Sequence, residues 1–556
     1  MQVTPRSESE IQVEETILSV RNLTVDLPRG MERKHAVKDV SFDLPRGKIL
    51  CVIGESGSGK SVTANTVMGL LPPAITVSAG QIIFRGEDLL KASKQDLRKL
   101  RGRVVSMIFQ DPLSALNPLM TVGDQVIEVM ASHDEGTPAS RAARAVELLD
   151  EVGLPEPQEM MHQYPFRLSG GQRQRVMIAM ALALEPDILI ADEPTTALDV
   201  TTQAQILDLI RDIQVRKGMS VMFITHDFGV VSEIADEVIV MEKGLIVEQA
   251  SAEQVFSAPK HPYTKRLIAA VPGLKEDDSD AHKSLPAAEL DDIVLSVEGL
   301  NKTYRSGGGW FSKERTVAAV QNASFVLRRG KTLGVVGESG SGKTSLGRLV
   351  IKLMESDSGK MLYRGTDIAP LKESEFRPLR PKIQMIFQDP FASLNPRSTI
   401  GHILTVGPIA QGMKREVARS KALSILEQVG LDGGTFGRYP HEFSGGQRQR
   451  IGIARALMFD PDVLVADEAV SALDVSIQAQ ILELLQDIQE QTHVALFFIT
   501  HDLRVASQVC DEILVMHKGR IVEAGPPSQI FHAPQNAYTR QLVSAIPGAE
   551  RTPQAT

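Results

Sequence analysis

The chain carries the same eight-residue string twice, with one change. GESGSGKS occupies residues 54–61, and GESGSGKT occupies residues 337–344. An apolar run precedes each copy, from Ile49 to Ile53 and from Leu333 to Val336, and a plausible helix follows it. Strand, loop and helix in this order are the context that a GxxxxGK[ST] phosphate-binding loop requires. The sequence therefore predicts two nucleotide sites in one chain.

The repeat extends well beyond these strings. From Ser169 and Ser444 onward, corresponding residues are about 275 positions apart, which is too long for a solenoid repeat and fits two duplicated domains. The second half also holds an insertion, Ser306 to Glu314, whose glycines indicate a surface loop. An acidic stretch without aromatic residues separates the halves and predicts a solvated linker. The predicted organisation is a disordered tail (1–15), a nucleotide-binding domain (16–274), the linker (275–292), a second nucleotide-binding domain (293–550) and a tail (551–556).

Composition excludes several classes of protein. Apolar residues make up 42% and charged residues 23%, which is ordinary for a globular protein, and no apolar run is long enough to span a bilayer. Any role in transport is therefore expected to need separate membrane subunits. The net charge of -9 argues against a dominant nucleic-acid surface. The two cysteines, Cys51 and Cys510, have no ligand-like neighbours and are expected to be buried, without a disulfide or metal.

Each residue type in the repeated string has a chemical reason. Glycines such as Gly57 and Gly59 let successive backbone amides curl around phosphate, while the next helix directs its positive end at the same anion. Lys60 can reach the terminal phosphates, and the Ser61 hydroxyl can coordinate magnesium. The predicted phosphate-binding residues are Gly54, Gly57, Gly59, Lys60 and Ser61 in the first half and Gly337, Gly340, Gly342, Lys343 and Thr344 in the second.

Two acids end an apolar run in each half. DILIADE (187–193) and DVLVADE (462–468) have the pattern of buried parallel strands whose carboxyl ends meet a nucleotide. The first acid of each pair suits magnesium, and the second suits a general base for attack on the terminal phosphate. An acid in this place can also be a simple cap of the strand end. The metal candidates are Asp192 and Asp467, and the catalytic candidates are Glu193 and Glu468.

A third repeated string begins a helix. LSGGQRQR (168–175) and FSGGQRQR (443–450) place a serine and paired glycines where a helix starts. Backbone amides at such a start form a second anion-binding cluster.

The order of the motifs resembles a pair of ATP-binding cassettes. The phosphate loop is followed by FQDP, SGGQ, ADE, ALDV and ITHD, over nearly the whole chain. The resemblance implies an α/β fold of two tandem ABC-type P-loop NTPase domains, each with a RecA-like core, an antiparallel β subdomain and an α-helical subdomain, the first helical one from about 111 to 167. It also implies ATP and Mg2+ as cofactors.

In this family two cassettes pair head to tail, so that the phosphate loop of one and the SGGQ of the other enclose each ATP. The resemblance implies that Gln110 and Gln388 sense the terminal phosphate and also reach the metal. It implies that His226 and His501 contact the terminal phosphate. Asp199 and Asp474 match the loop that couples the sites. The first implied site contains Lys60, Ser61, Gln110, Asp192, Glu193 and His226 with Ser444, Gly446 and Gln447. The second contains Lys343, Thr344, Gln388, Asp467, Glu468 and His501 with Ser169, Gly171 and Gln172.

One position departs from the family pattern. The family places an aromatic residue under the adenine, and Tyr304 fits this role in the second half. The corresponding residue of the first half is Leu27, so stacking there is expected to be weaker or to come from another residue.

Finer resemblance concerns the transported substrate. HPYTKRLIAAVP (261–272), NAYTRQLVSAIP (536–547) and the FQDP segments resemble ATPase subunits of the oligopeptide, dipeptide and nickel uptake family. With two cassettes fused in one chain, the protein is similar to the fused ATPases of glutathione and microcin C type peptide importers. The resemblance implies two transmembrane permease subunits, a periplasmic or extracellular substrate-binding protein, and a peripheral position at the cytoplasmic face of the bacterial inner membrane. The alternative is a twin-cassette ATPase that acts on ribosomes or nucleic acid. The short acidic linker and the lack of zinc-binding cysteines favour the importer.

Overall fold

The computed structural model describes residues 16–31, 33–196, 198–270, 292–306, 315–389, 392–470 and 473–546. The chain divides into two compact units, and each contains one copy of the repeated strings. The first unit holds the described residues of 16–198 and 202–270, and the second holds 199–201 and the described residues of 292–546. The predicted tails lie outside the described residues, as do almost all of the predicted linker and of the insertion at 306–314. The predicted domain boundaries therefore stay predictions.

A six-stranded sheet forms the centre of the first unit, in the order β10-β9-β3-β8-β7-β6. β10 pairs antiparallel with β9, and the other pairs are parallel. All residues of β3, β7 and β8 are buried, as in parallel strands covered on both faces. Their carboxyl ends share one edge, which brings the phosphate loop and the two acids together. The strands are β3 (Ile49–Ile53), β6 (Val105–Ile108), β7 (Ile188–Asp192), β8 (Ser220–Thr225), β9 (Glu237–Glu242) and β10 (Leu245–Ser251).

Strand β3 separates two hydrophobic cores. Ile49, Cys51 and Ile53 belong to a core shared with the helices. Leu50 and Val52 belong to a core on the other face, shared with an antiparallel sheet. This alternation follows the two-residue period of a strand and makes the central sheet the middle layer of the unit.

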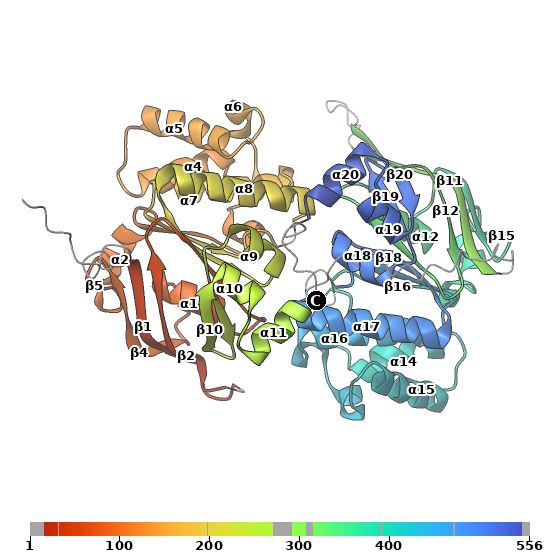
Figure 1. The fold of residues 1–556 in the computed structure, drawn as a ribbon. Coiled ribbons are helices and arrows are strands. Elements are labelled where there is room, and N and C mark those ends of the chain that lie inside the picture. Colours follow the sequence, from red (N-terminus) through yellow and green to blue (C-terminus); the bar gives the residue numbers. More distant parts are fainter. Residues whose placement is uncertain are drawn as a thin grey trace, which may run out of the picture. The chain divides into compact units, whose positions relative to one another are not determined.

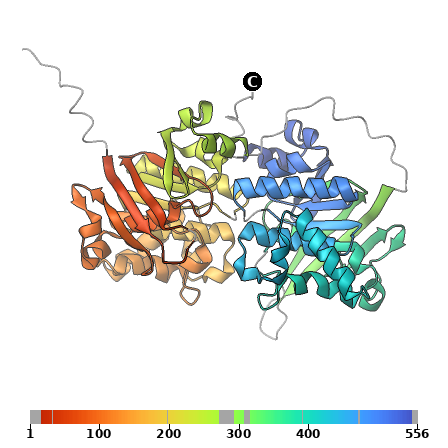
Figure 2. The same cartoon turned by 90° about the horizontal axis from the view of Figure 1, so that it is seen from below.

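The antiparallel sheet has the strand order β2-β1-β4-β5. Its strands are β1 (Thr16–Asp26), β2 (His35–Pro45), β4 (Thr76–Phe84) and β5 (Glu87–Asp88). The long strands lie side by side in Figure 2, where they are red and orange. The predicted antiparallel β subdomain is confirmed.

Helices α3 to α6 form a separate group in the first unit. Figure 1 shows α4, α5 and α6 gathered away from β1, β2 and β4. Helix α5 begins with Pro138, and Thr137 before it forms a capping box with Ser140, which explains where the helix starts. This group confirms the predicted helical subdomain. The helices are α1 (Lys60–Val67), α2 (Lys94–Leu100), α3 (Pro112–Ala115), α4 (Val122–Ala131), α5 (Pro138–Glu151), α6 (Pro157–Met160), α7 (Gly170–Leu182), α8 (Val200–Lys217), α9 (Phe228–Ile234), α10 (Ala252–Ser257) and α11 (Pro262–Ala269).

The second unit has the same plan. Its sheets have the orders β12-β11-β14-β15 and β16-β17-β18-β13-β19-β20. The strands are β11 (Ile293–Ser306), β12 (Arg315–Arg328), β13 (Thr332–Val336), β14 (Ser358–Tyr363), β15 (Thr366–Asp367), β16 (Ile383–Ile386), β17 (Val463–Asp467), β18 (Ala495–Ile499), β19 (Glu512–His517) and β20 (Arg520–Gly525). The helices are α12 (Lys343–Val350), α13 (Glu373–Phe376), α14 (Ile400–Ala410), α15 (Arg415–Gln428), α16 (Gly445–Leu457), α17 (Val475–Thr492), α18 (Leu503–Val509), α19 (Pro527–His532) and α20 (Ala537–Ser544).

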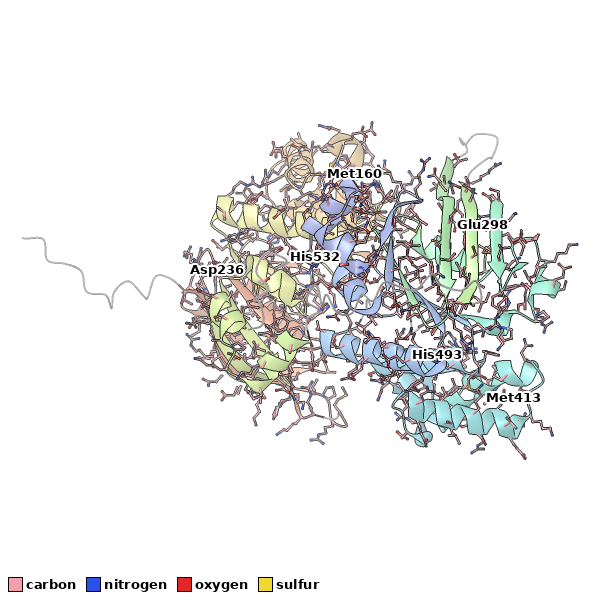
Figure 3. All side chains as sticks on the ribbon, turned by 45° about the vertical axis from the view of Figure 1, so that its right-hand side comes forward. Met160, Asp236, Glu298, Met413, His493 and His532 are labelled. Carbon is pink, nitrogen blue, oxygen red and sulfur yellow. The ribbon has the colours of Figure 1, made fainter. Side chains whose placement is uncertain are left out.

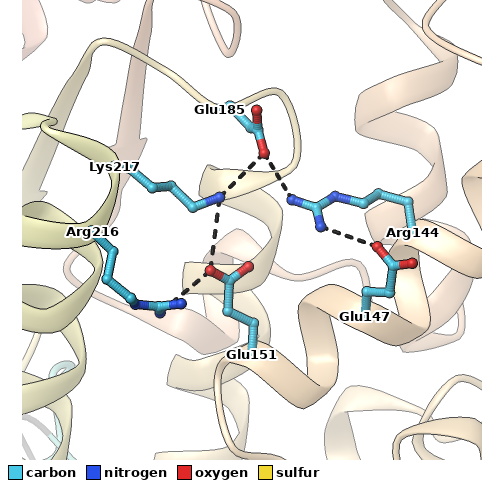
Figure 4. Close-up of polar contacts among 6 residues, drawn as sticks. All are labelled: Arg144, Glu147, Glu151, Glu185, Arg216 and Lys217. Carbon is cyan, nitrogen blue, oxygen red and sulfur yellow. Dashed lines mark hydrogen bonds and ion pairs between the residues drawn. The ribbon is translucent and has the colours of Figure 1, made fainter.

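A chain of ion pairs joins the helical subdomain of the first unit to the rest of that unit (Figure 4). Arg144 on α5 pairs with Glu185 at 3.1 Å, and Lys217 at the end of α8 contacts both Glu185 and Glu151. In the second unit a neutral hydrogen bond from Gln428 to Gln491 takes the place of the contact between Glu151 and α8. The two units therefore share a fold, but an ion pair at this contact of the helical subdomain in the first unit is replaced by a neutral hydrogen bond in the second.

Figure 3 draws the side chains of the described residues and labels Met160 and Met413 in the two helical subdomains. Cys51 and Cys510 are buried free cysteines, as expected. Burial raises the pKa of both thiols well above its ordinary value. Within the described part of the chain, no helix combines the length and the apolar character needed to cross a membrane.

Candidate active site

The phosphate loop of the first unit connects β3 to α1. Gly59 adopts a φ of 106°, and a Cβ there would lie 2.8 Å from the carbonyl oxygen of Ala36. A Cβ on Gly54 would lie 2.2 Å from the carbonyl oxygen of Met241. Both positions exclude a side chain, so the glycines of the string are needed for the shape of the loop.

The Lys60 side chain lies inside this loop and binds its backbone. Its Nζ donates to the carbonyl oxygens of Gly54 and Glu55, at 2.7 and 2.9 Å. The side chain is buried, and the nearby hydroxyl of Ser58 is buried without a hydrogen-bond partner among the described residues. Buried polar atoms normally have partners, so an unsatisfied hydroxyl inside the loop fits a site built for a polar ligand.

The second loop repeats this geometry. Lys343 Nζ donates to the carbonyl oxygens of Gly337 and Glu338, at 2.7 and 2.9 Å. The Ser341 hydroxyl is again buried and unsatisfied within the described residues. A Cβ on Gly342 would lie 2.2 Å from the carbonyl oxygen of Ala319.

A hydroxyl and a carboxylate meet beside each lysine. Ser61 Oγ donates to Asp192 Oδ1 at 3.0 Å, and Thr344 Oγ1 donates to Asp467 Oδ1 at 3.2 Å. Burial raises the pKa of Asp192 to about 6, with Glu193 adding to the effect, and burial also raises the pKa of Asp467. A nearby cation would favour the charged forms.

This donor set fits magnesium, which prefers oxygen ligands and keeps several waters or substrate phosphates. Among the described residues no cluster of three or more His, Cys, Asp or Glu side chains could hold a metal. A cation between the hydroxyl and the carboxylate would leave room for ligands from nucleotide, water and the glutamine of the FQDP string.

Glu193 follows β7 in a strained backbone conformation, with a φ of 48°. Its Oε2 accepts hydrogen bonds from Gln110 Nε2 at 2.8 Å and from Thr196 Oγ1 at 3.0 Å. His226 Nδ1 lies 3.3 Å from Oε1. Burial raises the pKa of Glu193, but the hydrogen bond and charge of His226, together with Lys60, outweigh it and lower the pKa to about 2. The carboxylate is therefore ionised at neutral pH.

Glu468 has the same surroundings in the second unit. Its φ is 46°, and its Oε2 accepts from Gln388 Nε2 at 2.7 Å. His501 Nδ1 lies 3.6 Å from that oxygen. Burial raises the pKa of Glu468 and lowers that of His501, but their mutual contact outweighs burial and shifts both pKa values toward the charged forms.

Each SGGQ string begins a helix with a capping box. The Ser169 hydroxyl accepts from the backbone N–H of Gln172 at 3.2 Å, and the Gln172 side chain accepts from the N–H of Ser169 at 3.0 Å. Ser444 and Gln447 make the same pair of contacts at the start of α16. Both serines are exposed, so each helix start is accessible on its own unit. Asp199 and Asp474 directly precede α8 and α17, and Gly171 and Gly446 lie in the first turns of α7 and α16.

The two residues compared as adenine contacts have different surroundings. Tyr304 lies on β11, 40% exposed, with its hydroxyl 3.3 Å from Ser345 Oγ on α12. The aromatic ring is therefore held beside the helix that follows the phosphate loop. Leu27 instead packs against the core of the first unit, and its backbone N–H donates to the carbonyl of Lys34.

The sequence analysis missed one contact of the phosphate loops. Tyr263 and Tyr538, near the C-terminal end of each unit, accept a hydrogen bond from the backbone N–H of Glu55 and Glu338, respectively. The sequence offered two signals: both tyrosines recur at corresponding positions of the repeat, and both lie in the strings that resemble the uptake family.

Comparison with known proteins gives consistent matches. The family model described as ABC transporter matches residues 37–196 and 320–471, and that described as Oligopeptide/dipeptide transporter, C-terminal region, matches residues 247–292 and 522–554. The Peptidoglycan transport ATP-binding protein YejF of Agrobacterium fabrum is 46% identical over 95% of this chain and 96% of its own length. The Glutathione import ATP-binding protein GsiA of Salmonella typhimurium is 45% identical over 96% of this chain and 90% of its own. Among solved structures, cbiO1 from Clostridium perfringens, part of the ABC transporter complex cbiONQ, matches with 25% identity and a TM-score of 0.39, covering 44% of this chain and 92% of that one.

Proposed function

The chain belongs to the ABC transporter family, and on this premise we propose that it powers the import of peptides through a membrane permease. It binds ATP and is an ATPase of this family. One observation carries the proposal for its mechanism: each unit brings together a lysine, a hydroxyl, two acids, a glutamine and a histidine in a similar arrangement. Both cassettes are therefore equipped for hydrolysis.

Each side chain has a defined task in this proposal. Lys60 exchanges the two carbonyl oxygens that it now binds for oxygens of the terminal phosphate. Ser61 and Asp192 hold Mg2+, which neutralises charge on the phosphates when it is bound. Glu193, ionised and oriented by Gln110, accepts a proton from the attacking water.

The histidine and the second unit complete the assignment. His226, already in contact with the Glu193 carboxylate, keeps that group charged and can reach the terminal phosphate. Lys343, Thr344, Asp467, Glu468, Gln388 and His501 take the same tasks in the second cassette.

We further propose that the cassettes pair head to tail within the chain. Each unit presents an exposed helix start at its SGGQ string, where backbone amides favour an anion. Ser444, Gly446 and Gln447 would then complete the site built on Lys60. Ser169, Gly171 and Gln172 would complete the site built on Lys343.

Import by this family implies membrane permease partners and a substrate-binding protein. Exposed apolar side chains support a docking surface for two permease subunits on the helical subdomain. Three exposed apolar side chains lie close to Gln110 in the sequence: Phe109 directly before it, and Leu113 and Leu119 after it. Leu119 is 85% exposed. Phe387 takes the place of Phe109 in the second unit and is 40% exposed. Movement of Gln110 on hydrolysis would thereby reach the permease, and the chain would lie peripherally on the cytoplasmic face of the inner membrane.

Peptides are the proposed cargo. The relatives that match nearly the whole chain are named for glutathione import and peptidoglycan transport, and both units end in the oligopeptide/dipeptide transporter region. We assign di- and oligopeptides as the substrate class. A role on ribosomes or nucleic acid is not favoured, because the relatives that match nearly the whole chain are named as transport proteins.

Reconstitution tests this function. The chain is combined in lipid nanodiscs with two permease subunits and a peptide-loaded binding protein, and phosphate release is measured. Turnover should rise severalfold over that of the chain alone, because productive closure is coupled to the permease. Ribosomes and DNA should leave turnover unchanged. Stimulation by ribosomes without any effect of the permease would refute the proposal.

A further inference from the structure

A tyrosine from the C-terminal part of each unit binds the phosphate loop of the same unit. The backbone N–H of Glu55 donates to Tyr263 Oη at 3.1 Å. The N–H of Glu338 donates to Tyr538 Oη, also at 3.1 Å. Both tyrosines lie in the region matched by the oligopeptide/dipeptide transporter C-terminal family. The same contact at the same distance in both units indicates a feature built into this type of cassette.

The tyrosine of the first unit is held firmly in place. The carboxylate of Glu248 on β10 accepts hydrogen bonds from the backbone N–H groups of Lys260 and His261, at 2.8 and 3.0 Å. His261 Nδ1 then accepts from the N–H of Tyr263 and caps α11. Tyr263 is only 3% exposed. The hydroxyl is therefore fixed relative to the central sheet, because β10 belongs to that sheet.

The second unit reaches the same result with different residues. Glu523 on β20 accepts from the backbone N–H groups of Gln535 and Asn536, at 2.8 and 3.0 Å, and Asn536 Oδ1 caps α20 through the N–H of Tyr538. The ring of Tyr538 stacks on His517 with centroids 3.9 Å apart. Burial raises the pKa of Tyr538 to about 12, so its hydroxyl stays neutral.

Tyr263 and Lys60 both contact Glu55 of the loop, through different atoms. Lys60 binds the carbonyl oxygens of Gly54 and Glu55, whereas Tyr263 binds the N–H of Glu55. When Lys60 turns to a phosphate, those carbonyls lose their donor. The contact with Tyr263 does not compete with phosphate and remains. At the start of the loop, the carbonyl of Met241 lies close to Gly54, and the hydroxyl of the tyrosine binds the next residue.

We infer that Tyr263 and Tyr538 are positioning residues, through which the C-terminal region of each cassette holds its phosphate loop in the shape that binds nucleotide. This inference rests on the proposed function of the loops. It predicts that loss of one hydroxyl weakens nucleotide binding only in the cassette that contains it.

The test measures the Kd for ADP with Mg2+ on the full chain, by isothermal titration calorimetry. Lys343→Ala leaves the first site as the one intact phosphate loop, and Lys60→Ala leaves the second. Tyr263→Phe keeps the ring and removes the oxygen. In the Lys343→Ala background it should raise Kd about three- to tenfold, the range expected for one net hydrogen bond. In the Lys60→Ala background it should change nothing, and Tyr538→Phe should show the reverse pattern.

Tyr363→Phe is the matched control. It also removes a largely buried hydroxyl, which donates to Asp462 at the amino end of β17, opposite the phosphate loop. Because its partner is a carboxylate, it should lower the unfolding temperature at least as much as Tyr263→Phe does, without changing Kd at either site. A Kd for Tyr263→Phe within twofold of its parent, or equal weakening at both sites, would overturn the inference. Failure of both lysine parents and of the wild type to bind ADP would overturn the proposed function itself.

Discussion

Replacement of both Glu193 and Glu468 by glutamine tests the assignment of the catalytic bases. Despite burial, contacts with His226 and Lys60 lower the pKa of Glu193 to about 2, so the carboxylate is in its ionised form at neutral pH, the form that a general base requires. Glutamine has the same shape and can still accept the hydrogen bond from Gln110, but it cannot act as a base. General base catalysis contributes about 10²- to 10⁴-fold, so turnover should fall at least about 100-fold, or about 2.7 kcal/mol in the barrier.

ATP binding should survive the double substitution. The contacts of Lys60, Ser61 and Asp192 do not depend on the replaced carboxylate, so the Kd for ATP should stay within about threefold. Phosphate release at saturating ATP measures turnover, and Glu253→Gln, on the exposed face of α10, is the isosteric control. A double variant that keeps more than about a tenth of wild-type turnover would refute the role of the two carboxylates as bases.

Two further predictions concern single sites. Tyr304→Ala should weaken nucleotide binding in the second cassette by about 1 to 3 kcal/mol, the scale of aromatic stacking on a base. Leu27→Tyr should strengthen binding in the first cassette. If titration shows the same Kd at each site as before the substitution, the adenine binds elsewhere. Gly171→Asp introduces a charge at the SGGQ helix start and should reduce ATP trapping at the site of Lys343 while sparing binding at Lys60. Loss confined to the Lys60 site in site-resolved trapping would contradict head-to-tail pairing.

Much of the fold was predictable because its signals are local. Apolar runs, glycine strings and paired acids each specify a strand, a loop or a strand end within a few residues of chain. The strand that ends in Asp192 and the loop that contains Lys60 are placed together by any parallel sheet with this order. The predicted strand, phosphate loop and paired acids of the α/β core follow from these patterns, as does the expectation that Cys51 is buried, whereas the antiparallel and helical subdomains were implied by the family resemblance.

Contacts between distant side chains were not predictable in this way. The hydrogen bond from Gln110 to Glu193 crosses 83 positions, and that from Glu55 to Tyr263 crosses 208. Each of these hydrogen bonds depends on where a helix or loop lies relative to the sheet. A local sequence pattern does not specify that position. The family resemblance predicted Gln110 as a site residue but not its partner in the absence of nucleotide.

The sequence by itself determined that this chain holds two copies of a nucleotide-binding fold, which residues form the phosphate loops, and where the acids follow. Only the tertiary structure decided the backbone φ of 48° at Glu193, the lowered pKa of its carboxylate and the tyrosine that contacts each loop. The physical reason is that spacing along the chain encodes strands and turns, whereas burial and hydrogen bonding depend on elements packed from far apart in the sequence.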